Sequence, residues 1–166
     1  VSLIDTPGAY PGIGAEERGQ GEAIAKNIYE MSKLKVPIVS VVIGEGASGG
    51  ALGIGVCDRM LMFENTWYSV ISPEGCASIL WRDASKAPEA ADSMRVTAQD
   101  LVEMGICDRI LKEPLGGAHR DSVEAASILK KAIIEEITML RKNENISYLD
   151  SRIDRYYRMG AFNSED

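Results

Sequence analysis

Residues 44–55 read GEGASGGALGIG, directly after the apolar segment VPIVSVVI at residues 36–43. Residues 38–43 are rich in β-branched side chains, which is typical of a parallel strand buried on both faces. Six of the twelve following residues are glycine, and GGALGIGVC predicts a helix that packs closely on its neighbours. Free N–H groups and the positive end of a helix dipole meet where a strand passes through glycines into a helix. The stretch therefore predicts a main-chain corner that stabilises negative charge.

Strand-like and helix-like segments alternate along the rest of the chain. The helical spacing of apolar residues, with charges between them, predicts a helix that includes Ile24, Ile28, Met31 and Leu34 and stops before Val36-Pro37. The alternation favours an α/β fold with mostly parallel strands. We see no internal repeat. The expected strands are residues 2–4, 38–43, 60–63, 67–71 and 106–111.

Three later helices carry start signals. Ser72 precedes Pro73 and Glu74, which is the pattern of a capping serine followed by proline at the first helical position. Thr97 with Asp100 predicts a capped short helix that ends at Gly105, and Asp121 with Glu124 predicts a capping box. The last signal opens a long amphipathic helix with apolar positions up to Leu140.

Composition excludes several classes of protein. The chain has 166 residues, 45% of them hydrophobic, and a formal net charge of −7. That charge disfavours a nucleic-acid partner, and no apolar run reaches the length of a membrane span. The three cysteines form no CxxC pair, and with a single histidine they do not make an ordinary structural zinc site. We expect reduced cysteines that serve as small apolar side chains.

The two ends of the chain suggest how it is organised. It opens on VSLID, which reads as a strand, and a buried strand needs partners for its backbone groups. We therefore expect residues 1–166 to be the C-terminal part of a longer protein. Within them, we expect one domain over residues 1–142 and a tail over residues 143–166 that is either a docking arm or partly disordered.

The glycine stretch admits four interpretations. A phosphate site is disfavoured because the stretch lacks the Lys-Ser/Thr ending of a P-loop, although DTPG at residues 5–8 imitates a GTPase loop. A serine hydrolase would use Ser48 in G-x-S-x-G, with Asp108 and His119 following in the order of an α/β-hydrolase. An oxyanion hole would use the backbone amides of Gly49 and Gly50 and needs no nucleophile. Tight packing of a helix on a sheet is the structural alternative.

Four long motifs in one order resemble a known family. They are IDTPGAYPGIGAEERGQGEAIAKN, KVPIVSVVIGEGASGGALGIG, YSVISPEGCASILWRDASKAPEAA and EPLGGAHRD. The chain resembles the α subunit of the acetyl-CoA carboxylase carboxyltransferase of bacteria and plastids over roughly residues 1–142. The segment DSRIDRYYRMGAF is similar to the C-terminus of that family.

The resemblance implies a crotonase (ClpP-like) fold, a spiral of ββα units that is incomplete here at its N-terminus. It also implies transfer of the carboxyl group from carboxybiotin on the biotin carboxyl carrier protein to acetyl-CoA, which gives malonyl-CoA for fatty acid synthesis. The implied partners are a β subunit, in an assembly of two α and two β chains, and biotin carboxylase. Zinc belongs to the β subunit, and the location is the bacterial cytoplasm or the plastid stroma.

The resemblance also assigns the site. The amides of Gly49 and Gly50 would act on the ureido oxygen of biotin, and a side chain on either glycine would crowd that ligand. Ser48 is then a capping or loop-bonding hydroxyl, and the resemblance places both Gly46 and Ser48 beside the cofactor. Because alanine tolerates positive φ poorly, we expect ordinary or slightly strained backbone at Ala47.

Other residues keep two interpretations. Gly8 and Tyr10 are expected to pack on biotin, although Tyr10 suits an interface equally well. Trp81 with Arg82 is either an interface anchor or part of the core.

Overall fold

A parallel β-sheet forms the centre of the protein. The computed structural model describes residues 1–142 and 147–160. The strand order is β1-β2-β3-β5, and β4 pairs with the far end of β2. In chain order the elements are β1 (Ser2–Thr6), α1 (Ile13–Glu17), α2 (Gln20–Ser32), β2 (Val39–Ala47), α3 (Ser48–Gly55), β3 (Arg59–Phe63), β4 (Trp67–Ser69), α4 (Pro73–Trp81), the 3-10 helix η1 (Ala84–Lys86), α5 (Ala87–Met94), α6 (Ala98–Glu103), β5 (Arg109–Leu111), α7 (Ser122–Arg141) and α8 (Tyr148–Tyr157).

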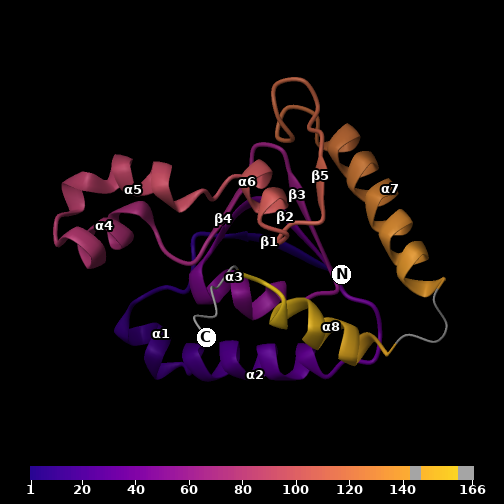
Figure 1. Cartoon of the computed structure of the whole chain (residues 1–166), viewed down its shortest axis with the longest axis horizontal. Helices are drawn as coiled ribbons and strands as arrows, with labels where there is room; N and C mark the ends of the chain where they lie inside the picture. The colour runs from indigo at the N-terminus through magenta and orange to yellow at the C-terminus, as the bar shows by residue number, and fades with distance from the viewer. Residues whose placement is uncertain (143–146, 161–166) are drawn as a thin grey trace, which may run out of the picture.

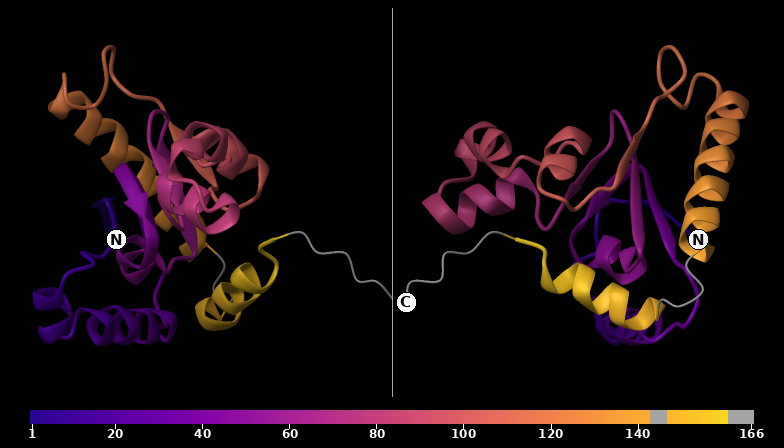
Figure 2. Two further views of the ribbon diagram at one scale, coloured as in Figure 1. Left: turned by 90° about the vertical axis from the view of Figure 1, so that its left-hand side faces the viewer. Right: turned by 45° about the vertical axis from the view of Figure 1, so that its right-hand side comes forward.

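Helices cover both faces of this sheet (Figure 1). On one face, Ile4, Val42 and Met62 pack against α3 and α6. On the other face, Val41 and Leu61 pack against α7, which lies along the sheet in both figures (Figure 2). Successive strand side chains point to opposite faces, so a strand that supplies both cores, such as β2, has apolar residues on both of its faces. The α/β fold with parallel pairing is confirmed.

Strand β2 is longer than the sequence predicts. Its first part pairs with β1 and β3, and its last three residues, 45–47, pair with β4. Two glycines in this last part of β2, Gly44 and Gly46, lie against side chains of neighbouring strands. A Cβ added at Gly44 would meet the Asp5 carboxylate, and one at Gly46 would meet the Tyr68 ring at 2.5 Å. The first third of the glycine stretch, residues 44–47, is therefore strand, and its glycines make room for neighbouring side chains.

The start signals of three helices are confirmed. Ser72 accepts a hydrogen bond from the Gly75 N–H and caps α4. Thr97 and Asp100 form the reciprocal bonds of a capping box at α6. At α7 the Asp121 side chain caps the helix by accepting from the N–H of Glu124, but Glu124 does not make the reciprocal bond, so the predicted capping box is wrong there. These caps act within four residues, so the sequence contains all that is needed to predict them.

Helices α4 and α5 project from the body as a pair (Figures 1 and 2). Helix α4 contacts mainly α5 and the 3-10 helix between them. Ile79, Leu80 and Trp81 on α4 are exposed, so the core interpretation of Trp81 is wrong. Its role as an interface anchor stays a prediction.

Helix α8 docks on the body through three side chains. Arg152 is only 2% exposed, and its guanidinium donates to both carboxylate oxygens of Asp58, at 3.0 and 2.9 Å. Arg155 donates to Asp108 Oδ1 at 2.8 Å. The hydroxyl of Tyr156 accepts from the N–H of Cys57 at 2.9 Å. The expected tail thus contains a docked helix, and its other segments, 143–146 and 161–166, lie outside the described residues.

Among the described helices, none combines the length and apolar character that a membrane crossing requires.

Candidate functional site

The glycine corner is formed where β2 passes into α3. Ala47, the last residue of β2, has ordinary extended backbone with φ −123°, as expected. The unusual geometry falls on Ser48, whose φ of +56° is rare for a residue with a side chain. Such positions occur where the surrounding structure enforces them, often at functional sites.

No side chain caps the N-terminus of α3. Ala47 is its N-cap residue, and no side-chain hydrogen bond is made there. The expectation that Ser48 caps this helix is therefore wrong. The first N–H groups of a helix have no intrahelical acceptor, and they carry the positive end of the helix dipole. The corner thus presents backbone N–H donors to which no side chain is bonded, so these donors are available to an anion.

Gly50 is a point of close backbone approach. A Cβ at this position would lie 2.8 Å from both the carbonyl carbon of Gly8 and the backbone nitrogen of Ala9. Gly8 has φ +121°, and a Cβ there would lie 3.5 Å from Ala47 O and Ser48 Cβ. The backbone of the loop after β1 therefore packs directly against the backbone of the corner after β2.

Gly49 differs from its neighbour because the space beside it is open. A Cβ at Gly49 would meet only Ile24 Cδ1, at 4.0 Å. The expectation that side chains on both glycines would crowd a ligand needs correction: at Gly50 a side chain would first collide with the protein's own backbone. At Gly49 the chain itself leaves room for a bound molecule.

Helix α3 gains little stability from its own sequence. Gly49, Gly50, Gly53 and Gly55 make up half of its eight residues, and each glycine costs about 1 kcal/mol relative to alanine in a helix interior. Close packing explains the last two. A Cβ at Gly53 would lie 3.3 Å from Ile24 Cγ2, and one at Gly55 would lie 3.2 Å from Tyr68 Oη. Tertiary contacts hold α3 in place.

Tyr10 lies in the loop between β1 and α1 and is 72% exposed. With its amide oriented to satisfy both bonds, Gln20 donates to the Tyr10 carbonyl at 2.8 Å and accepts from its N–H at 2.9 Å. The backbone of Tyr10 is thus fixed by α2, while its ring is free to contact a ligand or a partner.

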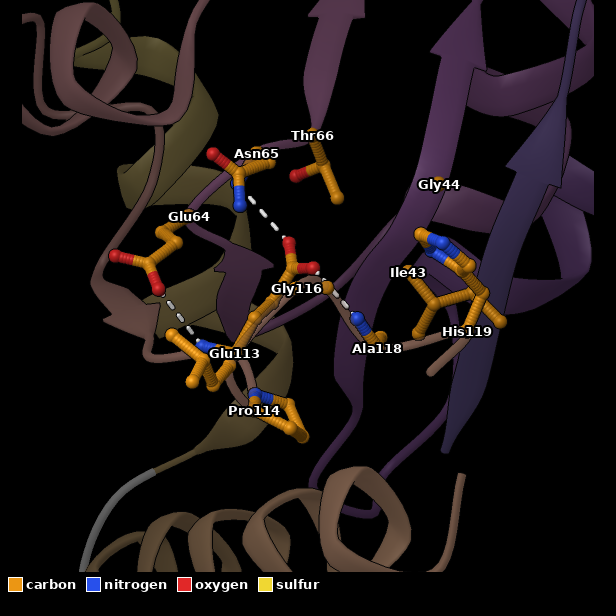
Figure 3. A pocket seen from close by; sticks show the side chains of 12 residues that line it. Ile43, Gly44, Glu64, Asn65, Thr66, Glu113, Pro114, Gly116, Ala118 and His119 are labelled. Carbon is orange, nitrogen blue, oxygen red and sulfur yellow. Dashed lines mark hydrogen bonds between the residues drawn. The ribbon is translucent and has the colours of Figure 1, made fainter. Parts of the chain in front are cut away.

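A cavity of about 560 Å³ lies at the carboxyl ends of β2, β3 and β5 (Figure 3). Glu113 and Glu64 accept hydrogen bonds from backbone N–H groups of the loops that line it. Glu113 accepts from the N–H groups of Asn65 (3.1 Å) and Ala118 (2.8 Å). Glu64 accepts from the Glu113 N–H and pairs with Lys112, and the bond to Lys112 is the main reason that the pKa of Glu64 lies below its ordinary value. The loop at residues 113–119 is thereby pinned to the sheet.

The structure does not assemble the hydrolase triad. His119 lines the cavity together with Ile43 and Gly44 (Figure 3), whereas Ser48 is not part of that lining. Asp108 precedes β5, at the opposite end of that strand from the loop of His119, and is bound by Arg59, Arg155 and the N–H of Met60. Ser48, Asp108 and His119 therefore lie in separate parts of the structure.

The cysteines are free, as expected. Burial raises the pKa of the Cys107 thiol to about 11 and also raises that of Cys57. Within residues 1–142 and 147–160, no group of three histidine, cysteine or acidic side chains could hold a metal ion.

Comparison with known proteins assigns the family. Residues 1–160 match the family described as acetyl co-enzyme A carboxylase carboxyltransferase-like. The chain belongs to this family. The match covers the strand-to-helix corner, the Gly8 loop and α8.

Curated relatives of the chain are named acetyl-coenzyme A carboxylase carboxyl transferase subunit alpha. The protein of that name from Chlorobium luteolum is 56% identical over 165 residues, which cover 99% of this chain and 49% of the relative. The one from Flavobacterium psychrophilum is 55% identical over 98% of this chain and 51% of its own length. The carboxyltransferase-like chain thus spans about half the length of the curated relatives it matches.

Solved structures show the same fold. A Pseudomonas malonate decarboxylase hetero-tetramer in complex with coenzyme A contains a chain with TM-score 0.68 and 17% identity, covering 93% of this chain and 62% of that chain. Transcarboxylase 12S gives TM-score 0.60 and 23% identity, covering 78% of this chain and 26% of that chain. The expected crotonase-type fold of the carboxyltransferase-like chain is confirmed.

Sequence reasoning missed the residues that dock α8, although their signal is present. Cys-Asp-Arg occurs at residues 57–59 and again at 107–109, each time just before a strand. Asp58 accepts from the Ile38 N–H and Asp108 from the Met60 N–H, both at 2.7 Å. Each aspartate thus fastens its strand to the preceding parallel strand, and α8 supplies one arginine to each.

Proposed function

We propose that this chain is the biotin-facing part of the α subunit of an acetyl-CoA carboxylase carboxyltransferase, which makes malonyl-CoA from carboxybiotin and acetyl-CoA. The observation that carries the proposal is the corner at Ser48–Gly50: an uncapped helix N-terminus with open space at Gly49, in a member of the carboxyltransferase-like family. The names of the relatives supply the substrate class.

The corner fits a flat anionic ligand. Biotin, when bound, supplies the carboxyl group and the base that removes a proton from the acetyl methyl group. This chain would stabilise negative charge on the ureido oxygen with the N–H groups of Gly49 and Gly50. One such fixed donor is typically worth about 3–4 kcal/mol of barrier, and the dipole of α3 adds to it. Gly8, Tyr10, Gly46 and Ser48 would form the surroundings of the cofactor.

The partners follow from the same proposal. We expect a β subunit that binds acetyl-CoA and carries zinc, in an assembly of two α and two β chains, together with the biotin carboxyl carrier protein and biotin carboxylase. The relatives named above are bacterial, which favours the cytoplasm over the plastid stroma.

Gly49→Val in the complete subunit tests the oxyanion role. The new side chain would enter the open space, and we expect malonyl-CoA decarboxylation by the reconstituted complex to fall at least about a hundredfold. Gly21→Val is the control for valine in a helix away from the corner, because a Cβ at Gly21 on α2 meets nothing within 4 Å.

Size-exclusion chromatography with the β subunit separates two functions. A catalytic corner predicts that the Gly49→Val complex assembles but is inactive, whereas a non-catalytic scaffold predicts that assembly itself is lost. Full activity of the variant would refute the proposal.

A further inference from the structure

The C-terminal end of α3 has no local cap. The last four carbonyl groups of a helix lack intrahelical donors, and helices often satisfy them with a left-handed glycine just after the helix. Here the C-cap residue is Val56, with extended backbone at φ −62° and ψ 118°. The orphan carbonyls of this glycine-rich helix therefore depend on donors from elsewhere in the chain.

Two other helices supply those donors. From α2, the side-chain amide of Asn27 donates to the carbonyl oxygen of Gly53. From α8, the hydroxyl of Tyr156 donates to the carbonyl oxygen of Gly55 at 3.4 Å and accepts from the N–H of Cys57 at 2.9 Å. Tyr156 thus joins the last residue of α3 to the turn that follows it, although about a hundred residues separate the two partners.

The position of Tyr156 is itself fixed. Arg155, its neighbour, bonds to Asp108 and to the carbonyl oxygen of Ile106 at 2.7 Å. Arg152, one turn earlier, is buried against Asp58 and donates to the carbonyl oxygens of Leu34 (2.8 Å) and Val36 (3.0 Å). Figure 1 shows α8 beside α3 and α2, where these bonds are made.

We infer that Tyr156 and Asn27 are positioning residues that hold the C-terminal end of α3, so that the amides of Gly49 and Gly50 at its other end meet the substrate oxygen in the correct place. The inference rests on the proposed function. Its physical basis is the difference between the two ends of α3. Side chains from other helices donate to the carbonyl groups at the C-terminal end, whereas no side chain caps the N–H groups at the N-terminal end. An error of about 1 Å in such donors can cost on the order of a hundredfold in rate.

Tyr156→Phe in the complete subunit tests the inference, with Tyr148→Phe as the matched control. Tyr148 is on the same helix, and its hydroxyl also donates to a backbone carbonyl, that of Leu140 on α7, at 3.3 Å. Both variants lose one hydroxyl–carbonyl bond, but only Tyr156→Phe also removes the acceptor of the Cys57 N–H and releases α3. Asn27→Leu, which keeps the side-chain shape, is a second variant that releases the same helix.

Two measurements are made on each variant: amide hydrogen exchange over residues 48–57, and steady-state decarboxylation of malonyl-CoA by the reconstituted complex. For Tyr156→Phe and Asn27→Leu we expect faster exchange in this segment and a kcat about tenfold lower, with KM for malonyl-CoA within about twofold. Tyr148→Phe should show neither change. Unchanged exchange in Tyr156→Phe, or equal effects in Tyr148→Phe, would overturn the inference whatever the function of the corner.

A third result would separate the two proposals. Faster exchange in α3 with normal kcat would show that Tyr156 holds the helix but that this does not matter for turnover. It would overturn the positioning role and count against catalysis at the corner, which Gly49→Val tests independently by steric means.

Discussion

Replacing Arg152 by leucine tests whether α8 is an integral part of the fold. The guanidinium is buried and makes two bonds to Asp58 and four to the backbone carbonyls of residues 31, 32, 34 and 36. In Arg152→Leu, the Asp58 carboxylate, whose side chain is 5% exposed, would keep only the N–H of Ile38.

The expected loss is large. Removing one partner of a buried ion pair typically destabilises a protein by about 3–5 kcal/mol, because the other charge remains buried and unpaired. Since domains are stable by only about 5–15 kcal/mol, Arg152→Leu should leave a marginal protein. Asp58→Asn in the same background removes the buried charge and keeps an acceptor for Ile38, so the double variant should recover about 1–3 kcal/mol.

Urea unfolding of the single and double variants measures these free energies. Arg158→Leu is the control: its ion pair with Asp154 is 3.8 Å long and exposed, so the free energy of unfolding should change by less than about 0.5 kcal/mol. A loss below about 1 kcal/mol in Arg152→Leu, or no recovery on adding Asp58→Asn, would refute the conclusion that a buried ion pair anchors α8.

Two further predictions concern the corner and the cavity. Gly50→Ala should lower the free energy of unfolding by at least about 1–3 kcal/mol, because its Cβ meets the backbone of Gly8 and Ala9. Gly49→Ala should be neutral or slightly stabilising, because the space beside Gly49 is open. Equal shifts in melting temperature for the two variants would contradict this difference in packing. The pKa of Glu64 lies below its ordinary value of 4.5, so its pairing stabilises the fold above that pH and is lost as pH falls through the lowered pKa. The gap in urea midpoint between wild type and Glu64→Gln should therefore shrink as the pH is lowered further below 4.5, and a constant gap would contradict this assignment.

Much of the fold could be predicted because its signals are local. The caps at Ser72, Thr97 and Asp121 involve bonds over three residues, and the apolar run at residues 38–43 marks a central strand. The glycine corner was predicted for the same reason: a strand, glycines and a helix follow one another directly. The four motifs were long enough to indicate the family, which the match over residues 1–160 confirms.

What could not be predicted depends on distant contacts. Gly49 and Gly50 are adjacent residues of the same type, and nothing local distinguishes them. Yet Gly49 faces open space, whereas Gly50 faces the backbone of the loop after β1. The end of β2 was misplaced because its last residues are strand through pairing with β4 and, at Gly46, with Thr6 of β1. The two Cys-Asp-Arg segments read as ordinary strand starts until α8 is placed against them.

By itself, the sequence determined the kind of fold, the helix starts and the place where a strand turns into a glycine-rich helix, because hydrophobic period, caps and glycine act over a few residues. Only the tertiary structure decided which corner amide has free space around it, and that a tyrosine and two arginines near residue 155 support the helix that begins at residue 48. Those outcomes depend on which backbone and charged groups meet across forty to a hundred residues, and no local preference encodes such meetings.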